Sequence, residues 1–310
     1  MSRPPGATVG GQAVIEGVMM RAPNGWSVAV RRPDGLIEAR AESLPRLSAR
    51  HRAAKIPFWR GIMVLIESLN LGFRALSWSA QKAADEEEEE VKPRHIAAAM
   101  AIALVLFIGL FMILPLLIAR GAEQLLGEST VLFNVIDGVV RVALFVGYIW
   151  AIGRSDEIAR VFMFHGAEHK TIHAYEAGDP LSIKTIQSYS PRHPRCGTNF
   201  LLIVILIAIV VFTAIGRPSW FWLVASRILL IPVIAGLAYE VLKLAANQKW
   251  MSAASKPGIW LQRLTTREPS DDQVEVAIAA LMTALAPDER AAVELRGPVA
   301  PGGLAYELTT

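Results

Sequence analysis

Four long apolar stretches interrupt the polar sequence, and each predicts a helix that crosses a membrane. The stretches are Ile96–Ile118, Val131–Ile152, Phe200–Ile215 and Trp220–Val241. A helix needs about 20 mostly apolar residues to cross the hydrocarbon layer of a bilayer. The pattern therefore predicts an α-helical membrane protein with a four-span helical bundle. The first and second spans lie in residues 96–152, and the third and fourth lie in residues 200–241.

A different pattern, ahead of the first span, predicts a small β meander. The turn signals Pro23-Asn24-Gly25 and Pro33-Asp34-Gly35 separate short apolar segments within residues 8–42. We expect three strands, at Ala13–Met20, Trp26–Arg32 and Leu36–Ala41. A basic linker follows them, so residues 1–55 make up the first unit of the chain.

The segment Phe58–Ser79 has the apolar spacing of a helix, but charged residues such as Arg60 and Glu67 interrupt it. A spanning helix needs a cleaner apolar run, whereas a helix lying in the bilayer interface carries a polar face. We expect an interfacial amphipathic helix, and a spanning helix stays open as the alternative. This helix and the acidic linker after it make up residues 56–95.

Residues 153–199 are predicted to hold a helix and a loop rich in histidine. Ser155-Asp156-Glu157 has the composition of a helix start, and Gly178-Asp179-Pro180 that of a helix stop. Apolar Val161 and Phe162 precede the histidines on the same face. We therefore expect this helix to dock on the membrane face of the bundle.

Residues 242–310 are predicted to form a C-terminal helical segment and a tail. Ser270-Asp271-Asp272-Gln273 resembles a capping box and precedes an apolar periodicity. We expect an amphipathic helix at Asp271–Ala286 and a disordered tail at Pro298–Thr310.

The composition supports a membrane location and narrows the possible partners. Apolar residues make up 53% of the 310 residues and charged residues 19%, with a mean hydropathy of +0.38. These values favour a protein partnered by the lipid bilayer. The net charge of +3 and the spread of basic residues along the chain argue against nucleic-acid binding. The sequence does not indicate a protein partner.

Lysine and arginine lie mostly on one side of the predicted spans. They are frequent before the first span, between the second and third spans, and after the fourth span. The positive-inside rule then predicts a multi-pass protein of the cytoplasmic membrane with both termini in the cytoplasm. The histidine-rich helix would lie on the cytoplasmic side. The N-terminal residues lack the apolar stretch of a cleaved signal peptide, which agrees with this topology.

His165, His169 and His173 recur every four residues and therefore follow one face of the predicted helix. The string His165-Gly-Ala-Glu168-His169 also has the H-x-x-E-H form of a group of metalloproteases. Two imidazoles one helical turn apart can bind one metal ion, and a nearby carboxylate can accept a proton from water. We predict that His165 and His169 bind a divalent metal ion, with zinc favoured, and that Glu168 is the catalytic base.

The third metal ligand is left open among three residues, His173, Glu240 and Cys196. Histidine nitrogen, carboxylate oxygen and thiolate sulfur all bind zinc. His173 also has an interpretation as a residue that orients a ligand, and Cys196 as a small helix-cap residue. Further site candidates near the predicted centre are Glu176, His193 and Arg195.

Four separated motifs together resemble the YqhQ family of bacterial membrane proteins. They are Val9-Gly-Gly-Gln-Ala-Val-Ile-Glu-Gly-Val-Met-Met-Arg21, the His165–Glu176 string, Pro194-Arg-Cys-Gly-Thr-Asn-Phe200, and the segment from Leu264 to Ala277. Proteins of this family are described as predicted metal-dependent enzymes with a domain of unknown function. The resemblance implies that Gln12, Glu16 and Arg21 belong to the family signature. Glu16 and Arg21 would line the same site or form a local salt bridge.

These observations lead to two hypotheses about function. The first is a metal-dependent integral membrane enzyme, a hydrolase acting on a peptide, lipid or phosphoester at the cytoplasmic membrane surface. The second is a non-enzymatic membrane transporter, sensor or assembly factor. It would use the histidines as a structural metal site or a pH-responsive site. Asp137, Arg141 and Arg227 lie within predicted spans and support the second hypothesis.

Overall fold

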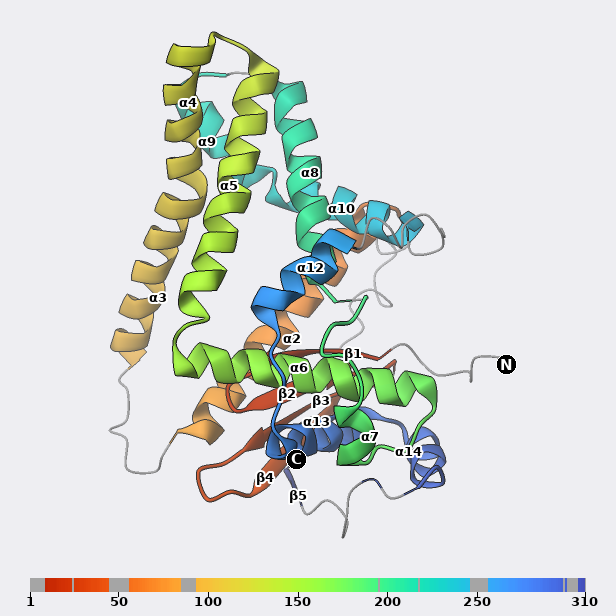
Figure 1. The fold of residues 1–310 in the computed structure, drawn as a ribbon. Coiled ribbons are helices and arrows are strands. Elements are labelled where there is room, and N and C mark those ends of the chain that lie inside the picture. Colours follow the sequence, from red (N-terminus) through yellow and green to blue (C-terminus); the bar gives the residue numbers. More distant parts are fainter. Residues whose placement is uncertain are drawn as a thin grey trace.

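The computed structural model shows a tall helical bundle standing on a domain built around a β-sheet (Figure 1). It describes residues 9–23, 25–44, 56–84, 93–194, 196–216, 218–245, 256–297, 299 and 306–309. The predicted acidic linker and most of the predicted basic linker lie outside the described residues.

The sheet has five strands in the order β1-β2-β3-β4-β5. The first four are antiparallel neighbours: β1 (Gly10–Val14), β2 (Gly17–Arg21), β3 (Gly25–Arg31) and β4 (Ile37–Ser43). The fifth, β5 (Tyr306–Thr309), comes from the C-terminal end and pairs in parallel with β4.

Two predictions about these strands were wrong. The segment expected as one strand, Ala13–Met20, is a hairpin, because a two-residue turn at Ile15 and Glu16 divides it. Glu16 takes the left-handed backbone conformation, with φ 50°, which reverses the chain. The C-terminal tail was expected to be disordered, but residues 306–309 form the edge strand β5.

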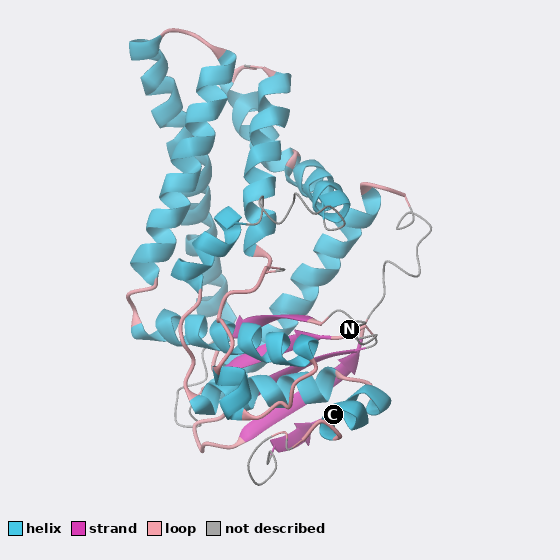
Figure 2. Cartoon of the chain, turned by 45° about the vertical axis from the view of Figure 1, so that its right-hand side comes forward, coloured by secondary structure: helices cyan, strands magenta, loops and turns pink. Residues whose placement is uncertain are grey.

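Helices cover both faces of the sheet (Figure 2). Helix α2 (Trp59–Ala83) packs on one face, where Trp26, Val28 and Val30 meet Leu71 and Ala75. On the other face, Val18 and Met20 of β2 and Ala29 of β3 pack against α6 (Asp156–Ala177) and α13 (Asp271–Ala284). Side chains of a strand point alternately to the two faces, so β2 and β3 are buried on both sides.

Helix α13 is not amphipathic as predicted. The capping box of Ser270 and Gln273 is present at its start, but almost every residue from Gln273 onward is buried. The reason is its position between the sheet, α6 and the short helix α7 (Ile183–Gln187). Helix α14 (Pro287–Glu294) follows it.

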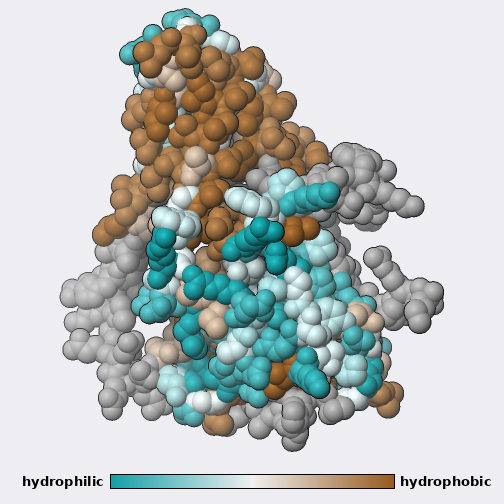
Figure 3. Space-filling model, in the orientation of Figure 1, coloured by the Kyte–Doolittle hydropathy of each residue, from teal (hydrophilic) through white to brown (hydrophobic). Residues whose placement is uncertain are grey.

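Within the described residues, the bundle contains two helices that are long and apolar enough to cross a membrane, or up to three, rather than a clear four. Helices α3 (Pro93–Ile108) and α4 (Leu114–Leu126) run on through a π-helical turn, Gly109–Ile113, and give the candidate span Ala101–Leu126. Helix α5 (Thr130–Ile152) is the second. In Figure 3 apolar residues cover this part of the molecule and polar residues cover the sheet domain.

The predicted fourth span is broken into α9 (Trp220–Leu229) and α10 (Ile231–Ala245), which are bent by 47°. Pro232 lies in the first turn of α10, and a proline has no N–H to continue the α9 hydrogen-bond ladder. The pair would be a third span only if both halves are counted as one. Helix α8 (Thr198–Ile215) is shorter, with a clearly apolar part at Ile203–Ile215. Helix α12 (Lys256–Thr265) packs against α8 and α5 and leads back to the sheet domain.

Buried charges tie α5 to α9. Arg227 Nη2 donates to Asn134 Oδ1 at 3.0 Å and to Asp137 Oδ2 at 3.3 Å. Arg141 Nη2 donates to Asp137 Oδ1 at 3.0 Å. Asp137 and Arg227 are both only 3% exposed, so the carboxylate compensates two guanidinium groups in a place that excludes water.

We therefore expect Asp137→Ala to destabilise the bundle by about 3–5 kcal/mol, because a buried arginine would lose its counter-charge. Thermal unfolding in detergent micelles measures the change. Glu294→Ala, at an exposed position of α14, is the control and should change stability by less than about 0.5 kcal/mol. Equal stability of the two variants would show that the ion pair does not hold the bundle together.

Candidate metal centre

Helix α6 carries the predicted ligands, and its boundaries were predicted correctly. Ser155 caps the N-terminus, with its Oγ accepting from the Ile158 N–H at 3.3 Å. Gly178 ends the helix in the left-handed conformation, with φ 80°. The expected docking on the bundle was wrong, because Phe164, Ala167 and other α6 residues pack on the sheet and on α13. The helix lies below the bundle in Figure 1.

Two backbone carbonyl groups orient His165 and His169. His165 Nδ1 lies 2.8 Å from the Thr265 carbonyl oxygen, and His169 Nδ1 lies 2.7 Å from that of Pro191. A carbonyl oxygen can only accept, so each Nδ1 must carry the proton and each Nε2 keeps its lone pair. Metal-binding histidines in proteins are usually oriented in this way.

Cys196 completes a group of three possible metal ligands with His165 and His169. The ligand atoms of the three all lie within 4.8 Å of one another, and Cys196 Sγ is 3.5 Å from His165 Nε2. Zinc binds nitrogen at about 2.1 Å and thiolate sulfur at about 2.3 Å, so neighbouring ligand atoms in a tetrahedral site are about 3.5 Å apart. The donor set and the spacing therefore fit zinc with small movements of the side chains.

Glu168 lies against this group and is 4% exposed. Its Oε2 atom has no hydrogen-bond partner within the described part of the chain. Burial raises the pKa of its carboxyl group to about 8; Cys196 raises it further, whereas His165 and the Gly11 N–H lower it. A Cβ on Gly11 would lie 3.1 Å from Glu168 Cγ and Cδ, so a glycine lets β1 approach this carboxylate closely.

The site opens into a pocket of about 120 Å³. Its described lining residues are Val9, Gly10, Gly11, His165, Glu168, His169, Ile172, His193, Cys196 and Gly197. None of them is lysine or arginine. Burial lowers the pKa of His169 to about 2 and that of His193 to about 4. Both imidazoles are therefore neutral near pH 7, the form in which histidine binds metal.

Three other candidates lie beside the group without joining it. His173 Nε2 contacts the Arg192 carbonyl oxygen at 3.0 Å, and its ring stacks on Tyr189. Glu176 Oε2 is 3.6 Å from His193 Nε2. The rings of His173 and His193 are 4.3 Å apart. Arg195 lies outside the described residues.

Glu240 is placed in a different contact, at the start of α2. It accepts from the Phe58 N–H at 3.1 Å and from Arg60 Nε at 2.7 Å. It thus caps α2 and binds that helix to α10, which accounts for its carboxylate without a metal ion.

The remaining family-signature residues join elements of the sheet domain. Gln12 Nε2 donates to the Gly72 carbonyl at 3.4 Å, on the α2 side of the sheet. Glu16 accepts from Arg160 Nε at 2.7 Å and so ties the first hairpin to α6. Arg21 pairs with the buried Glu67 at 2.5 Å. Glu16 and Arg21 thus form no local salt bridge with each other and do not line the pocket; each pairs with a residue far along the chain.

The sequence did not point to the groups that hold the ligands in place. The Gln262 side chain bonds both the N–H and the carbonyl of His193, each at 2.8 Å, and thereby holds the loop from Pro191 to Cys196. The carbonyl groups of Pro191 and Thr265 belong to residues without ligand chemistry. The only available signal was that Thr265 lies within one of the family motifs.

Gly166 is a second residue that only the structure identifies. A Cβ at this position would lie 2.0 Å from the Arg267 carbonyl oxygen, because the chain after α12 crosses α6 there. We expect Gly166→Ala to destabilise the protein by about 1–3 kcal/mol and to weaken metal binding, since the displaced segment carries Thr265. Thermal unfolding and metal titration measure both effects.

Gly147→Ala is the matched control for this prediction. Gly147 also lies in a helix, but a Cβ there would meet no atom within 4 Å. This variant should be as stable as the wild type or slightly more stable, because alanine favours helix over glycine. Unchanged stability and metal binding of Gly166→Ala would contradict the proposed packing.

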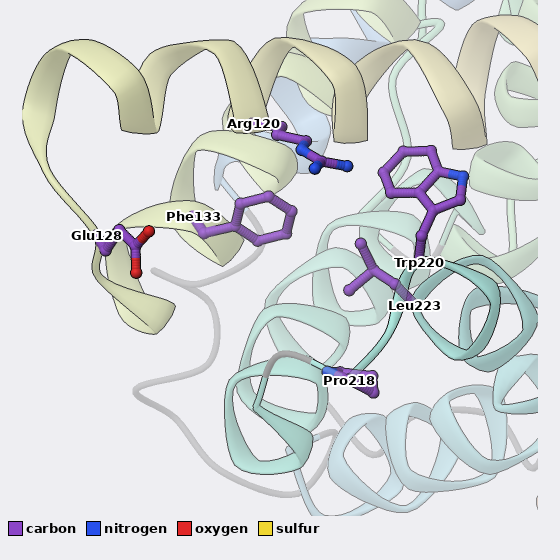
Figure 4. Close-up of a pocket in the computed structure, with 6 residues that line it drawn as sticks. All are labelled: Arg120, Glu128, Phe133, Pro218, Trp220 and Leu223. Carbon is purple, nitrogen blue, oxygen red and sulfur yellow. The ribbon is translucent and has the colours of Figure 1, made fainter.

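A larger pocket, of about 440 Å³, lies at the opposite end of the bundle (Figure 4). Its described lining residues are Arg120, Glu128, Phe133, Pro218, Trp220 and Leu223. The Arg120 guanidinium lies 5.6 Å from the centre of the Trp220 ring, a cation–π contact. This pocket has no group of metal ligands in its described lining. The smaller pocket, which contains His165, His169 and Cys196, is therefore the candidate metal centre.

Comparison with known proteins identifies relatives but no activity. The family model described as "Protein of unknown function (DUF1385)" matches residues 56–287. The chain is 34% identical over 290 residues to "Uncharacterized protein YqhQ" of Bacillus subtilis (strain 168), covering 87% of this chain and 89% of that protein. No solved structure matches.

Proposed function

Because this chain belongs to the DUF1385 family of proteins of unknown function, we propose its activity from the candidate site alone. It is a metal-dependent hydrolase that acts at the cytoplasmic surface of a membrane. His165, His169 and Cys196 hold a divalent ion, with zinc favoured by the nitrogen and sulfur donors. Glu168 is the base.

The observation that supports this proposal best is the Glu168 carboxylate. A buried carboxylate with an unpartnered oxygen costs stability. It lies beside three ligands that converge on one point. Structural zinc sites are closed by four protein ligands, whereas catalytic sites have three and leave a position open. A group of three ligands with the Glu168 carboxylate beside it fits a catalytic zinc site.

Each side chain then has a definite task in hydrolysis. A bound divalent ion would lower the pKa of a water molecule and polarise the carbonyl or phosphoryl group of the substrate. The Thr265 and Pro191 carbonyls keep the His165 and His169 lone pairs aimed at one point. Glu168 accepts the proton of the attacking water and passes it to the leaving group.

The proposed location rests on the distribution of apolar and basic residues. Two to three helices of the bundle are long and apolar enough to cross a membrane. The histidine site lies in the sheet domain, on the segment between α5 and α8 that also carries Arg154, Arg160, Lys170, Lys184 and Arg192. The positive-inside rule then puts this domain, and with it both termini, in the cytoplasm.

A transporter or sensor is the alternative, and the buried Asp137, Arg141 and Arg227 would be its main feature. These charges bond to one another and to Asn134, which gives them a role in packing α5 against α9. We therefore favour the enzyme. A coordination position of the metal that stays open to water separates the two hypotheses, because a structural site is closed.

Removal of metal tests the proposed function. The purified protein in detergent micelles is incubated with ester, amide and phosphoester probes before and after treatment with a chelator. We expect hydrolysis of at least one probe class, loss of more than about 90% of the rate on chelation, and recovery on adding zinc. A rate that chelation leaves unchanged, or no hydrolysis by zinc-loaded protein, would contradict the proposal.

A further inference from the structure

The sheet has an unprotected edge next to the candidate metal centre. Strand β1 is the first strand of the sheet, and within the described ranges no strand pairs with its outer side. Its sequence, Gly10–Val14, contains no proline and no charged residue. Natural proteins usually block exposed edges with such residues because an open edge pairs with other chains. An open edge without them is suited to binding.

The register of the first hairpin shows which backbone groups face outward. Val14 and Gly17 close a two-residue turn and must form a hydrogen-bonded pair. Hydrogen-bonded pairs alternate along an antiparallel ladder, so Gln12 and Gly10 bond inward to β2 as well. The N–H and C=O groups of Gly11 and Ala13 therefore point away from the sheet. Among the described residues, no hydrogen bond to the Ala13 backbone groups comes from another element.

These outward groups lead directly into the pocket. Gly10 and Gly11 line it together with His165, Glu168 and Cys196. Gly10 is exposed, and a Cβ there, on the face of the sheet opposite to Glu168, would meet no atom within 4 Å. The Gly11 N–H lies at Glu168 and favours its charged form. A chain paired with β1 would thus pass within reach of the carboxylate and of the three ligands.

We propose that the open edge of β1 binds an extended polypeptide as an added strand, and that the bond hydrolysed is a peptide bond. This inference rests on the proposed hydrolase function and names its substrate class. The Gly11 N–H donates to Glu168, which leaves the Gly11 C=O and the N–H and C=O of Ala13 on the outer edge. Backbone groups at this spacing are complementary to another extended backbone. Val9 and Ile172 give the pocket an apolar wall suited to a side chain of the peptide.

The reaction needs only water as a co-reactant. The water oxygen bonds to the peptide carbonyl carbon while Glu168 takes a proton from that water. The carbon–nitrogen bond then breaks, and the proton passes from Glu168 to the leaving nitrogen. The products are a carboxylic acid and an amine, which exchange a proton to give a carboxylate and an ammonium group at neutral pH, and nothing is oxidised or reduced.

The test uses the zinc-loaded full-length protein in detergent micelles and four probes. They are the peptides of a tryptic digest of denatured casein, N-acetyl-alanine p-nitroanilide, phosphatidylglycerol vesicles and p-nitrophenyl phosphate. We expect new peptide termini by mass spectrometry, produced only with zinc. Hydrolysis of the vesicles or the phosphate with no cleavage of peptides would overturn this inference but not the hydrolase. No hydrolysis of any probe would overturn both.

The variant Ala13→Pro tests the pairing itself. Proline removes the outward N–H of Ala13 and places its ring on the open edge, without touching a hydrogen bond to β2. We expect the KM for casein peptides to rise at least about tenfold, with kcat within about twofold. Ala13 lies about 7 Å along the strand from Gly11, beyond the reach of the single-residue anilide. Hydrolysis of the anilide should therefore not change.

Ala13→Ser keeps the N–H and is the control for the change of side chain. It should behave like the wild type with both amide probes. The zinc content and the melting temperature of both variants show whether the fold is intact. Wild-type KM values for peptides in a folded, zinc-loaded Ala13→Pro variant would overturn the proposed pairing with β1.

Discussion

Replacing His165 and His169 together with alanine is expected to remove the metal ion from the purified protein. The wild type should contain about one zinc ion per chain, because one group of three ligands was found in the described part of the chain. The double variant should contain almost none. Loss of a group that only orients a ligand already costs about 10- to 100-fold in affinity, and loss of two of three ligands must cost more.

Elemental analysis and zinc titration measure this change, and two further variants make the result specific. His165→Asn with His169→Asn places an amide N–H near each former Nδ1, so the bonds to Thr265 and Pro191 survive while the Nε2 atoms are lost. It should fold and lack zinc. His173→Ala should keep its zinc, because His173 is not one of the three converging ligands. Equal zinc contents in the wild type and in the two double variants of His165 and His169 would end the metal hypothesis.

Glu168→Gln is expected to keep the metal ion and to lose most of the hydrolytic rate. Glutamine has nearly the same shape but cannot accept the proton from water. General bases contribute about 10²- to 10⁴-fold, so we expect a fall of this size in kcat. The rate with the best probe and the zinc content are measured on the same preparation. A variant that retains zinc and more than about a third of the wild-type rate would exclude Glu168 as the base.

The same substitution has a second consequence that needs no substrate. In the metal-free protein burial raises the pKa of Glu168 to about 8, compared with 4.5 in an exposed carboxyl group. Below pH 4.5 the group is protonated in both the folded and the unfolded state. Between pH 4.5 and 8 the unfolded state loses the proton and the folded state keeps it, so the free energy of unfolding falls as pH rises.

Metal-free Glu168→Gln should therefore be more stable than the metal-free wild type above about pH 5. The difference should grow up to about pH 8 and reach a few kcal/mol, at about 1.4 kcal/mol for each unit of pKa shift. Below pH 4.5 the two proteins should be equally stable. Thermal unfolding across this range measures the difference, and zinc should reduce it because a cation stabilises the carboxylate. A difference that does not depend on pH would show that Glu168 is not held in its neutral form.

If Glu168→Gln both stabilises the protein and abolishes hydrolysis, the buried carboxylate is retained for its function and not for stability. Natural proteins tolerate buried groups that cost stability mainly where function requires them. The pairing of Glu16 with Arg160 and of Arg21 with Glu67 shows the opposite case, in which charged residues satisfy one another and hold the domain together. The two kinds of charge look alike in the sequence.

The sequence by itself determined the local features of this protein. The helix boundaries at Ser155 and Gly178 follow from capping and from the left-handed conformation of glycine. The stripe of His165, His169 and Glu168 follows from the period of the helix. The apolar stretches of α3 to α5 follow from hydropathy. Each of these features depends on residues a few positions apart, where chain geometry alone decides the outcome.

Only the tertiary structure showed which residues lie together at the candidate site, and that the described helices give two to three candidate spans. Thr265, which orients His165, is 100 residues away, and Cys196 is 31 residues away. Residues so far apart come together through tertiary packing, and a periodic pattern in the sequence does not predict such contacts. Packing also pairs Glu240 with Arg60 and buries almost every residue of α13 from Gln273 onward. The open edge of β1 likewise exists only in the assembled sheet, where β1 pairs with one strand among the described residues.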